Sequence, residues 1–201
     1  MDLKLLAING SLTPSPSRTR TLLDLALAGT KSANPGVETR VLELREFNLA
    51  FCDGRRPDQY NDDTREALAL VAAADAYLVA TPVYRASYTG ALKNFFDLIP
   101  NDPDGADPLR GKAVGLIATG GSDHHFLVLE HQLRPLLGFF GAQTVARAVY
   151  AHPKDFNATK QVEGKLVGEL TRLGEEVVAL ATFLRESPSA FRPEHLRIRR
   201  E

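Results

Sequence analysis

Apolar runs of strand length alternate with helical repeats along this 201-residue chain, and this alternation constrains the fold most. The expected strands are 3–8, 37–44, 76–81, 113–118 and 143–149. The expected helices are 18–31, 64–74, 91–99, 126–140 and 161–185. Three of the strands, 3–8, 76–81 and 113–118, are apolar at nearly every position. Strands that are apolar on both faces are typical of a parallel sheet covered by helices on both sides.

Right-handed crossovers then restrict the topology to a doubly wound α/β sheet. Five strands and five helices fit the flavodoxin-like fold, a parallel sheet with the strand order 2-1-3-4-5. We expect one domain over residues 1–186, followed by a peripheral tail at 187–201 that contains Pro and Arg.

Composition excludes several classes of protein. The chain has 24 basic and 25 acidic side chains, and this balance disfavours a nucleic-acid binder or an acidic carrier. Its single cysteine, Cys52, forms no internal disulfide and fits a reducing compartment. No apolar stretch reaches the length of a membrane span, so we expect a cytoplasmic protein. We expect no metal site, because His124, His125 and His131 are not spaced to share an ion.

In a sheet of this order, ligands bind beyond the carboxyl ends of the strands, where the strand order reverses. That point lies between the first and third strands. The loops after the first, third and fourth strands, 9–19, 81–90 and 119–125, are therefore the candidate ligand loops.

The loop at 9–19 carries five hydroxyl side chains and Arg18, and it leads into the N-terminus of a helix. Backbone N–H groups at a helix N-terminus favour anions, so the loop suits a phosphate. Neither a GxGxxG nor a GxxxxGK[ST] motif is present, which favours a single phosphate monoester over a dinucleotide or a nucleoside triphosphate. The alternative is an ordinary helix cap formed by Ser17 or Thr19.

The other two loops suit a planar ring. Tyr84 and Tyr88 offer flat apolar surface, and Gly120 and Gly121 allow a ligand to approach the backbone closely. Each loop has a plainer alternative, a contact with a neighbouring subunit for 81–90 and a simple strand-to-helix turn for 119–125. Together the three loops favour a mononucleotide with a planar base.

Three motifs resemble those of the NADPH-dependent FMN reductases, and above all those of the reductases that serve two-component monooxygenases in sulfonate utilisation. They are Asn-Gly-Ser at 9–11 with Pro-Ser-Arg-Thr at 16–19, the segment from Thr81 to Asp97, and Ala-Thr-Gly-Gly-Ser at 118–122. The likeness extends over about residues 3–150. The middle motif is the most specific of the three.

The resemblance implies roles for thirteen cofactor-binding residues and for no catalytic side chain. The FMN phosphate would be held by Ser11, Ser17, Arg18 and Thr19. The isoalloxazine would be lined by Pro82, Val83, Tyr84, Arg85 and Ser87, and its pyrimidine edge by Thr119, Gly120, Gly121 and Ser122. Many relatives have Arg where this chain has Thr13, so one charge contact differs here.

The resemblance also implies an activity. NADPH or NADH would pass a hydride to flavin N5, and the reduced flavin would go to a partner flavin-dependent monooxygenase. A first alternative keeps FMN bound and reduces quinones, azo dyes or metal oxyanions. Further alternatives are a flavodoxin-type electron carrier, which the near-neutral charge disfavours, and a flavin-free protein that binds another anion.

The segment 126–140 is apolar nearly all round, so we expect one side to face the sheet and another to face a second copy of the chain. This predicts at least a homodimer, and the resemblance to the sulfonate-utilisation reductases implies a homotetramer with this segment at its core. Pro135 cannot donate to the carbonyl of His131, which predicts a kink or π-bulge there. His131 would either cross the subunit interface near the flavin or form a hydrogen bond within the kinked helix.

Overall fold

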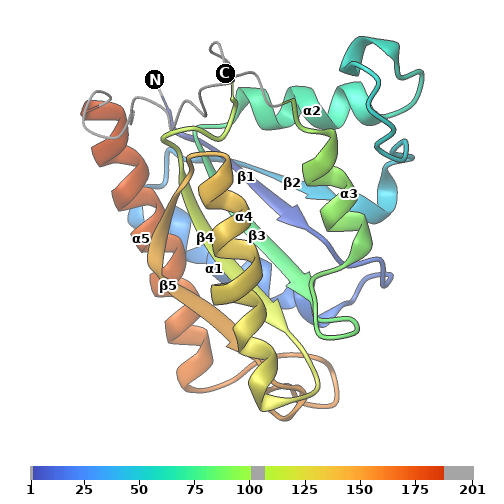
Figure 1. Cartoon of the computed structure of the whole chain (residues 1–201). Coiled ribbons are helices and arrows are strands. Elements are labelled where there is room, and N and C mark those ends of the chain that lie inside the picture. The colour runs from blue at the N-terminus through green and yellow to red at the C-terminus, as the bar shows by residue number, and fades with distance from the viewer. Residues whose placement is uncertain (1, 101–106, 188–201) are drawn as a thin grey trace.

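The computed structural model describes residues 2–100 and 107–187 and contains one five-stranded parallel sheet (Figure 1). The strands are β1 (Lys4–Asn9), β2 (Glu38–Glu43), β3 (Ala76–Pro82), β4 (Ala113–Thr119) and β5 (Gln143–Ala151). Their order is β2-β1-β3-β4-β5, so the predicted topology is confirmed. Except for Ser187, the tail expected at 187–201 lies outside the described residues.

Helices cover both faces of the sheet (Figure 1). On one face lie α1 (Arg18–Ala33) and α5 (Lys165–Glu186), and on the other lie α2 (Thr64–Ala73), α3 (Gly90–Leu98) and α4 (Arg134–Phe139). Alternate side chains of β1 serve the two cores, because successive residues of a strand point to opposite faces. Leu5 and Ala7 pack under α1 and α5, whereas Leu6 and Ile8 pack under α2 and α3. The sheet is thus buried on both sides, as its apolar strands predict.

Helices α1 and α5 pack with their backbones in close contact. A Cβ atom added at Gly29 would lie 2.0 Å from the Thr171 carbonyl oxygen, and one added at Gly174 would lie 2.0 Å from that of Ala26. Only glycine fits at these two positions. The contact fixes α1 against the sheet and so fixes the direction of its N-terminus.

The helix expected at 126–140 is interrupted by a π-helical segment just before Pro135. A 3₁₀ turn over Asp123–Phe126 precedes a π-helical segment over Leu129–Leu133, and α4 follows from Arg134. Since proline has no N–H to give to the His131 carbonyl, the helix widens by one residue at that point. The predicted π-bulge at His131 is confirmed.

The helix expected from 161 begins only at Lys165. Gly164 has a φ of 70°, a conformation outside the helical region, and it ends the preceding loop. Within that loop Phe156 and Val162 form an antiparallel bridge. Three more 3₁₀ turns lie at Leu44–Glu46, Pro57–Gln59 and Pro153–Asp155. Among the described helices, none combines the length and the apolar character that a membrane span requires.

Candidate functional site

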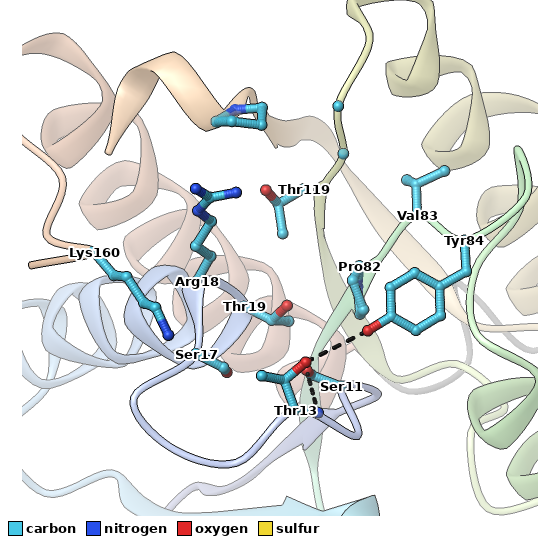
Figure 2. Close-up of a pocket in the computed structure, with 13 residues that line it drawn as sticks. Ser11, Thr13, Ser17, Arg18, Thr19, Pro82, Val83, Tyr84, Thr119 and Lys160 are labelled. Carbon is cyan, nitrogen blue, oxygen red and sulfur yellow. Dashed lines mark hydrogen bonds between the residues drawn. The ribbon is translucent and has the colours of Figure 1, made fainter. Parts of the chain in front are cut away.

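A cavity of about 340 Å³ lies at the carboxyl ends of β1, β3 and β4, where the strand order reverses (Figure 2). It brings together most of the predicted site residues: Ser11, Ser17, Arg18, Thr19, Pro82, Val83, Tyr84, Thr119, Gly120 and Gly121. Thr13, Pro153 and Lys160 complete the lining. The predicted residues Arg85, Ser87 and Ser122 lie outside it.

The N-terminus of α1 forms the polar end of the cavity. Ser17 caps the helix, because its Oγ accepts a 3.1 Å hydrogen bond from the Arg20 backbone N–H. Ser17 is therefore the cap, and Thr19 is not. The capping oxygen accepts this bond, so the hydroxyl proton is available to an anion. The first turn of α1 has no acidic residue, and no lining residue is acidic, so this end carries positive potential.

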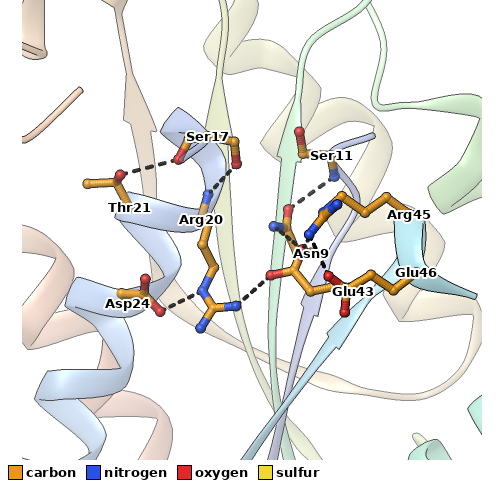
Figure 3. A network of polar contacts seen from close by, with 9 residues as sticks. All are labelled: Asn9, Ser11, Ser17, Arg20, Thr21, Asp24, Glu43, Arg45 and Glu46. Carbon is orange, nitrogen blue, oxygen red and sulfur yellow. Dashed lines mark hydrogen bonds and ion pairs between the residues drawn. The ribbon is translucent and has the colours of Figure 1, made fainter. Parts of the chain in front are cut away.

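A buried polar network holds the loop that precedes α1 (Figure 3). The Glu43 carboxylate accepts a 2.8 Å bond from Asn9 Nδ2 and a 2.6 Å bond from Arg20 Nη1. Asn9 Oδ1 in turn accepts a 3.0 Å bond from the Ser11 backbone N–H. Burial alone would lower the pKa of the Arg20 guanidinium, but hydrogen bonds to Asp24 and Glu43 outweigh it and raise the pKa. The network joins the ends of β1 and β2 to the first turn of α1.

A tight turn positions the aromatic wall of the cavity. The backbone groups of Tyr84 and Ser87 exchange hydrogen bonds of 2.8 and 3.2 Å. The two central residues, Arg85 and Ala86, have φ values of 53° and 62°, the pattern of a type I′ turn and a strained one for residues with side chains. The side chain of Tyr84 extends across the opening, and its hydroxyl lies 3.5 Å from Thr13 Oγ1 (Figure 2).

Two of the predicted residues outside the lining belong to this turn. Ser87 Oγ donates to Gln132 Oε1, and Gln132 Nε2 donates 3.1 Å to the Ala86 carbonyl. Ser87 thus ties the turn to the π-helical segment, while Arg85 is exposed at the tip of the turn. The Ser87 contact therefore acts on the shape of the loop that carries Tyr84.

The loop after β4 is held from behind by side chains at the end of β5. The Tyr150 hydroxyl lies 2.6 Å from the Gly120 carbonyl oxygen and 2.7 Å from that of Ser122. His152 Nε2 lies 3.1 Å from the Gly121 carbonyl oxygen. Burial raises the pKa of the Tyr150 phenol, which therefore keeps its proton for this contact. These contacts fix the strand-to-helix turn on the side away from the cavity.

Gly120 shows why the loop needs glycine. A Cβ atom there would lie 2.8 Å from His125 Nδ1 and 2.9 Å from Val83 Cβ. The backbone of the loop is therefore packed directly against the wall formed by Val83 and Tyr84. A planar ligand in the cavity meets peptide groups on this side and no bulky side chain.

None of the described histidine or cysteine side chains lines the cavity. The rings of His124 and His125 pack edge to face at 4.9 Å. Within residues 2–100 and 107–187, no three His, Cys, Asp or Glu side chains are grouped as metal ligands. Cys52 Sγ donates a 3.2 Å bond to the Asp97 carbonyl, away from the cavity lining.

The cavity has two chemically different ends. One end presents hydroxyl groups, the N-terminus of α1 and the cations Arg18 and Lys160. The other end presents Pro82, Val83 and Tyr84 opposite the peptide groups of residues 119–121. Such an arrangement suits a phosphate monoester that is joined to a flat, partly apolar ring. FMN has this chemistry, and the lining residues fit it.

Comparison with known proteins agrees with this geometry. Residues 3–157 match the family of NADPH-dependent FMN reductases. The chain belongs to this family. The resemblance carried by the three sequence motifs is thereby confirmed, and the match runs slightly past the expected end at residue 150.

Several similar proteins align with this chain over most of its length. An NAD(P)H-dependent FAD/FMN reductase of Geobacillus thermodenitrificans is 40% identical over 88% of this chain and 92% of its own. An NADH-dependent FMN reductase (SfnF) of Pseudomonas putida is 34% identical over 88% and 92%. The crystal structure of the apo form of the NADH:FMN oxidoreductase EMOB superposes with a TM-score of 0.75, at 30% identity over 97% of both chains.

The Glu43 network generates the first prediction. Glu43→Ala leaves Asn9 and Arg20 without their shared acceptor, and we expect it to lower the free energy of unfolding by about 1–3 kcal/mol. Glu38→Ala is the matched control, because Glu38 is exposed at the other end of β2. Urea unfolding of both variants measures the difference. Equal stabilities of the two variants would show that the network does not hold the loop.

Proposed function

We propose that this chain is an NAD(P)H-dependent FMN reductase of the cytoplasm that binds FMN in the cavity between β1, β3 and β4. The observation that supports this most is the two-ended lining of the cavity in a chain of this family. The relatives are named for NADH, NADPH or both, so the proposal covers either nicotinamide.

The lining suggests which residues meet which part of FMN. Ser11, Ser17, Arg18 and Thr19 face the phosphate, because they surround the N-terminus of α1. Pro82, Val83 and Tyr84 lie along the isoalloxazine, and Thr119, Gly120 and Gly121 meet its pyrimidine edge. Ser87 and Ser122 act on the shape of these loops through their hydrogen bonds. Arg85, Ser87 and Ser122 do not line the cavity.

Bound FMN supplies the chemistry, because flavin N5 accepts a hydride from the nicotinamide. The protein must hold the two rings face to face at about 3–3.5 Å, and it needs no acid–base side chain for this. The contacts that set the position are those of the Tyr84–Ser87 turn and of the carbonyl groups held by Tyr150 and His152. These groups fix the walls before a ligand enters, which lowers the cost of ordering the site.

The near-neutral charge supports a flavin-transferring reductase over an acidic electron carrier. We propose that the reduced flavin leaves for a partner flavin-dependent monooxygenase. Tyr84 in the cavity lining is 47% exposed, and this access to solvent suits a flavin that enters and leaves.

The proposal predicts that oxidation of NADH or NADPH depends on added FMN. We expect turnover on the order of 10 per second with free FMN and almost none without it. The loss of nicotinamide absorbance measures the rate. A protein purified yellow, with a rate independent of added FMN, would show a retained cofactor and a different acceptor. No oxidation with either nicotinamide in the presence of FMN would contradict the function.

We also propose that copies of the chain assemble through the segment 126–140 into a dimer or tetramer. Phe126, Leu127 and Phe139 expose 47%, 41% and 67% of their surface there, which is unfavourable for large apolar side chains in water. His131 is exposed in the π-helical segment between them, and we place it at this interface.

Assembly predicts a solution mass that is a multiple of the single-chain mass. We expect Phe139→Asp to shift the mass toward that of one chain, because the interface would bury a carboxylate. Phe51→Asp is the control, since Phe51 is 82% exposed in the loop between β2 and α2. Light scattering after gel filtration gives the mass. If the unsubstituted chain is monomeric, or if both variants dissociate equally, the segment is not the interface.

A further inference from the structure

Lys160 reaches the polar end of the cavity from a distant part of the sequence. It lies in the loop between β5 and α5, and its Nζ donates a 2.7 Å hydrogen bond to the Pro16 carbonyl, 144 residues away. The contact places the ammonium group just before Ser17, the cap of α1. Figure 2 shows Lys160 and Arg18 on the same side of the cavity, opposite Tyr84.

The loop that carries Lys160 is built around one asparagine. Asn157 Oδ1 accepts hydrogen bonds of 3.0 and 2.9 Å from the backbone N–H groups of Thr159 and Gln161. The Lys160 N–H donates 2.9 Å to the Asn157 carbonyl, and Lys160 itself has a φ of 60°. This is the left-handed region, which a lysine enters at a cost unless its surroundings hold it there. The side chain is thus presented by a defined loop.

The same loop packs against α1. The Phe156 ring lies under the Arg18 guanidinium, 5.4 Å from ring centroid to Cζ. Lys160 and Arg18 are therefore positioned together. Among the ion pairs of the described residues, neither cation has a carboxylate partner, and the cavity lining contains no acidic side chain.

A phosphate monoester needs more charge than Arg18 alone provides. At pH 7 such a group carries about −1.5 to −2. Thr13 lines the same cavity and is neutral. Lys160 brings the positive charge of the lining from +1 to +2, and its hydrogen bond to Pro16 keeps that charge beside the helix N-terminus.

We propose that Lys160 binds the 5′-phosphate of FMN together with Arg18 and so makes the protein select FMN over riboflavin. This rests on the proposed function, because it assumes that the phosphate lies at α1. The same phosphate chemistry occurs in the 2′-phosphate of NADPH. Ser11, Ser17 and Thr19 at the start of α1 are buried beside the end of β1, and this position favours the phosphate of the flavin over that of NADPH.

Lys160→Gln tests the proposal, because glutamine keeps a hydrogen-bond donor and removes the charge. Quenching of flavin fluorescence gives the Kd of FMN and of riboflavin for each protein without any turnover. We expect the Kd of FMN to rise about tenfold in Lys160→Gln, the loss of one charge-assisted contact. We expect the Kd of riboflavin to change less than about twofold, and Lys160→Arg to keep most of the FMN preference.

Lys165→Gln is the matched control, since Lys165 is exposed at the start of α5, close in sequence, and outside the cavity lining. It removes the same net charge and leaves both Kd values unchanged. Added salt gives a second readout. We expect it to weaken FMN binding more steeply in the unsubstituted chain than in Lys160→Gln, because a screened charge contact has been removed.

Three results would overturn the proposal. Equal increases in the Kd of FMN and of riboflavin would make Lys160 a structural tether for the loop. An unchanged Kd of FMN would exclude the contact. A change in the KM of NADPH relative to NADH, with FMN binding intact, would assign Lys160 to the 2′-phosphate of NADPH. Failure of the proposed function is seen separately, as FMN binding without oxidation of NADH or NADPH.

Discussion

The position of the ligand loop depends on one carboxylate. Glu43 at the end of β2 accepts hydrogen bonds from Asn9 at the end of β1 and from Arg20 in the first turn of α1. The loop 9–17 begins at Asn9, which this carboxylate holds, and ends at Ser17, which caps the helical turn that contains Arg20. The carboxylate therefore fixes the N-terminus of α1 relative to the end of β1. The close backbone contact between α1 and α5 fixes the same helix from its other side. The direction of the α1 N-terminus and the conformation of the loop before it follow from these two constraints.

The other two walls of the site pack against each other at Val83 and Gly120, and each is held by a different neighbouring element. The turn at Tyr84–Ser87 stores strain at Arg85 and Ala86 and is stabilised by Gln132 from the π-helical segment. The loop after β4 is stabilised by Tyr150 and His152 from β5. Each of these two walls of the cavity is held by hydrogen bonds on its outer side. Its inner surface can therefore contact the ligand. In this way the carboxyl ends of β1, β3 and β4 form a site for a mononucleotide before the ligand binds.

Local patterns predicted most of the fold and of the site, and the exceptions have physical reasons. The spacing of apolar residues in strands and helices depends only on nearby residues, so the order of the elements and the sheet topology could be derived from the sequence. The cap at Ser17 and the π-bulge before Pro135 follow from single residues.

Lys160 and Pro153 could not be found from the sequence, because no motif marks them. Only the return of the chain after β5 brings them to the cavity. The late start of α5 depends on the φ of Gly164, which the amphipathic pattern does not reveal. Ser87 matched a family motif but serves the turn, since its hydroxyl is engaged by Gln132.

The central claim is that FMN occupies this cavity with its phosphate at α1. Titration of ¹⁵N-labelled protein with FMN, followed by amide chemical shifts, tests it most directly. The account predicts that the largest shifts occur at 11–19, 83–84, 119–121 and 157–161, and that riboflavin leaves 17–19 and 160 nearly unmoved while shifting 83–84 and 119–121. Shifts centred on another surface, such as α2, or equal shifts at 17–19 with both flavins, would contradict it.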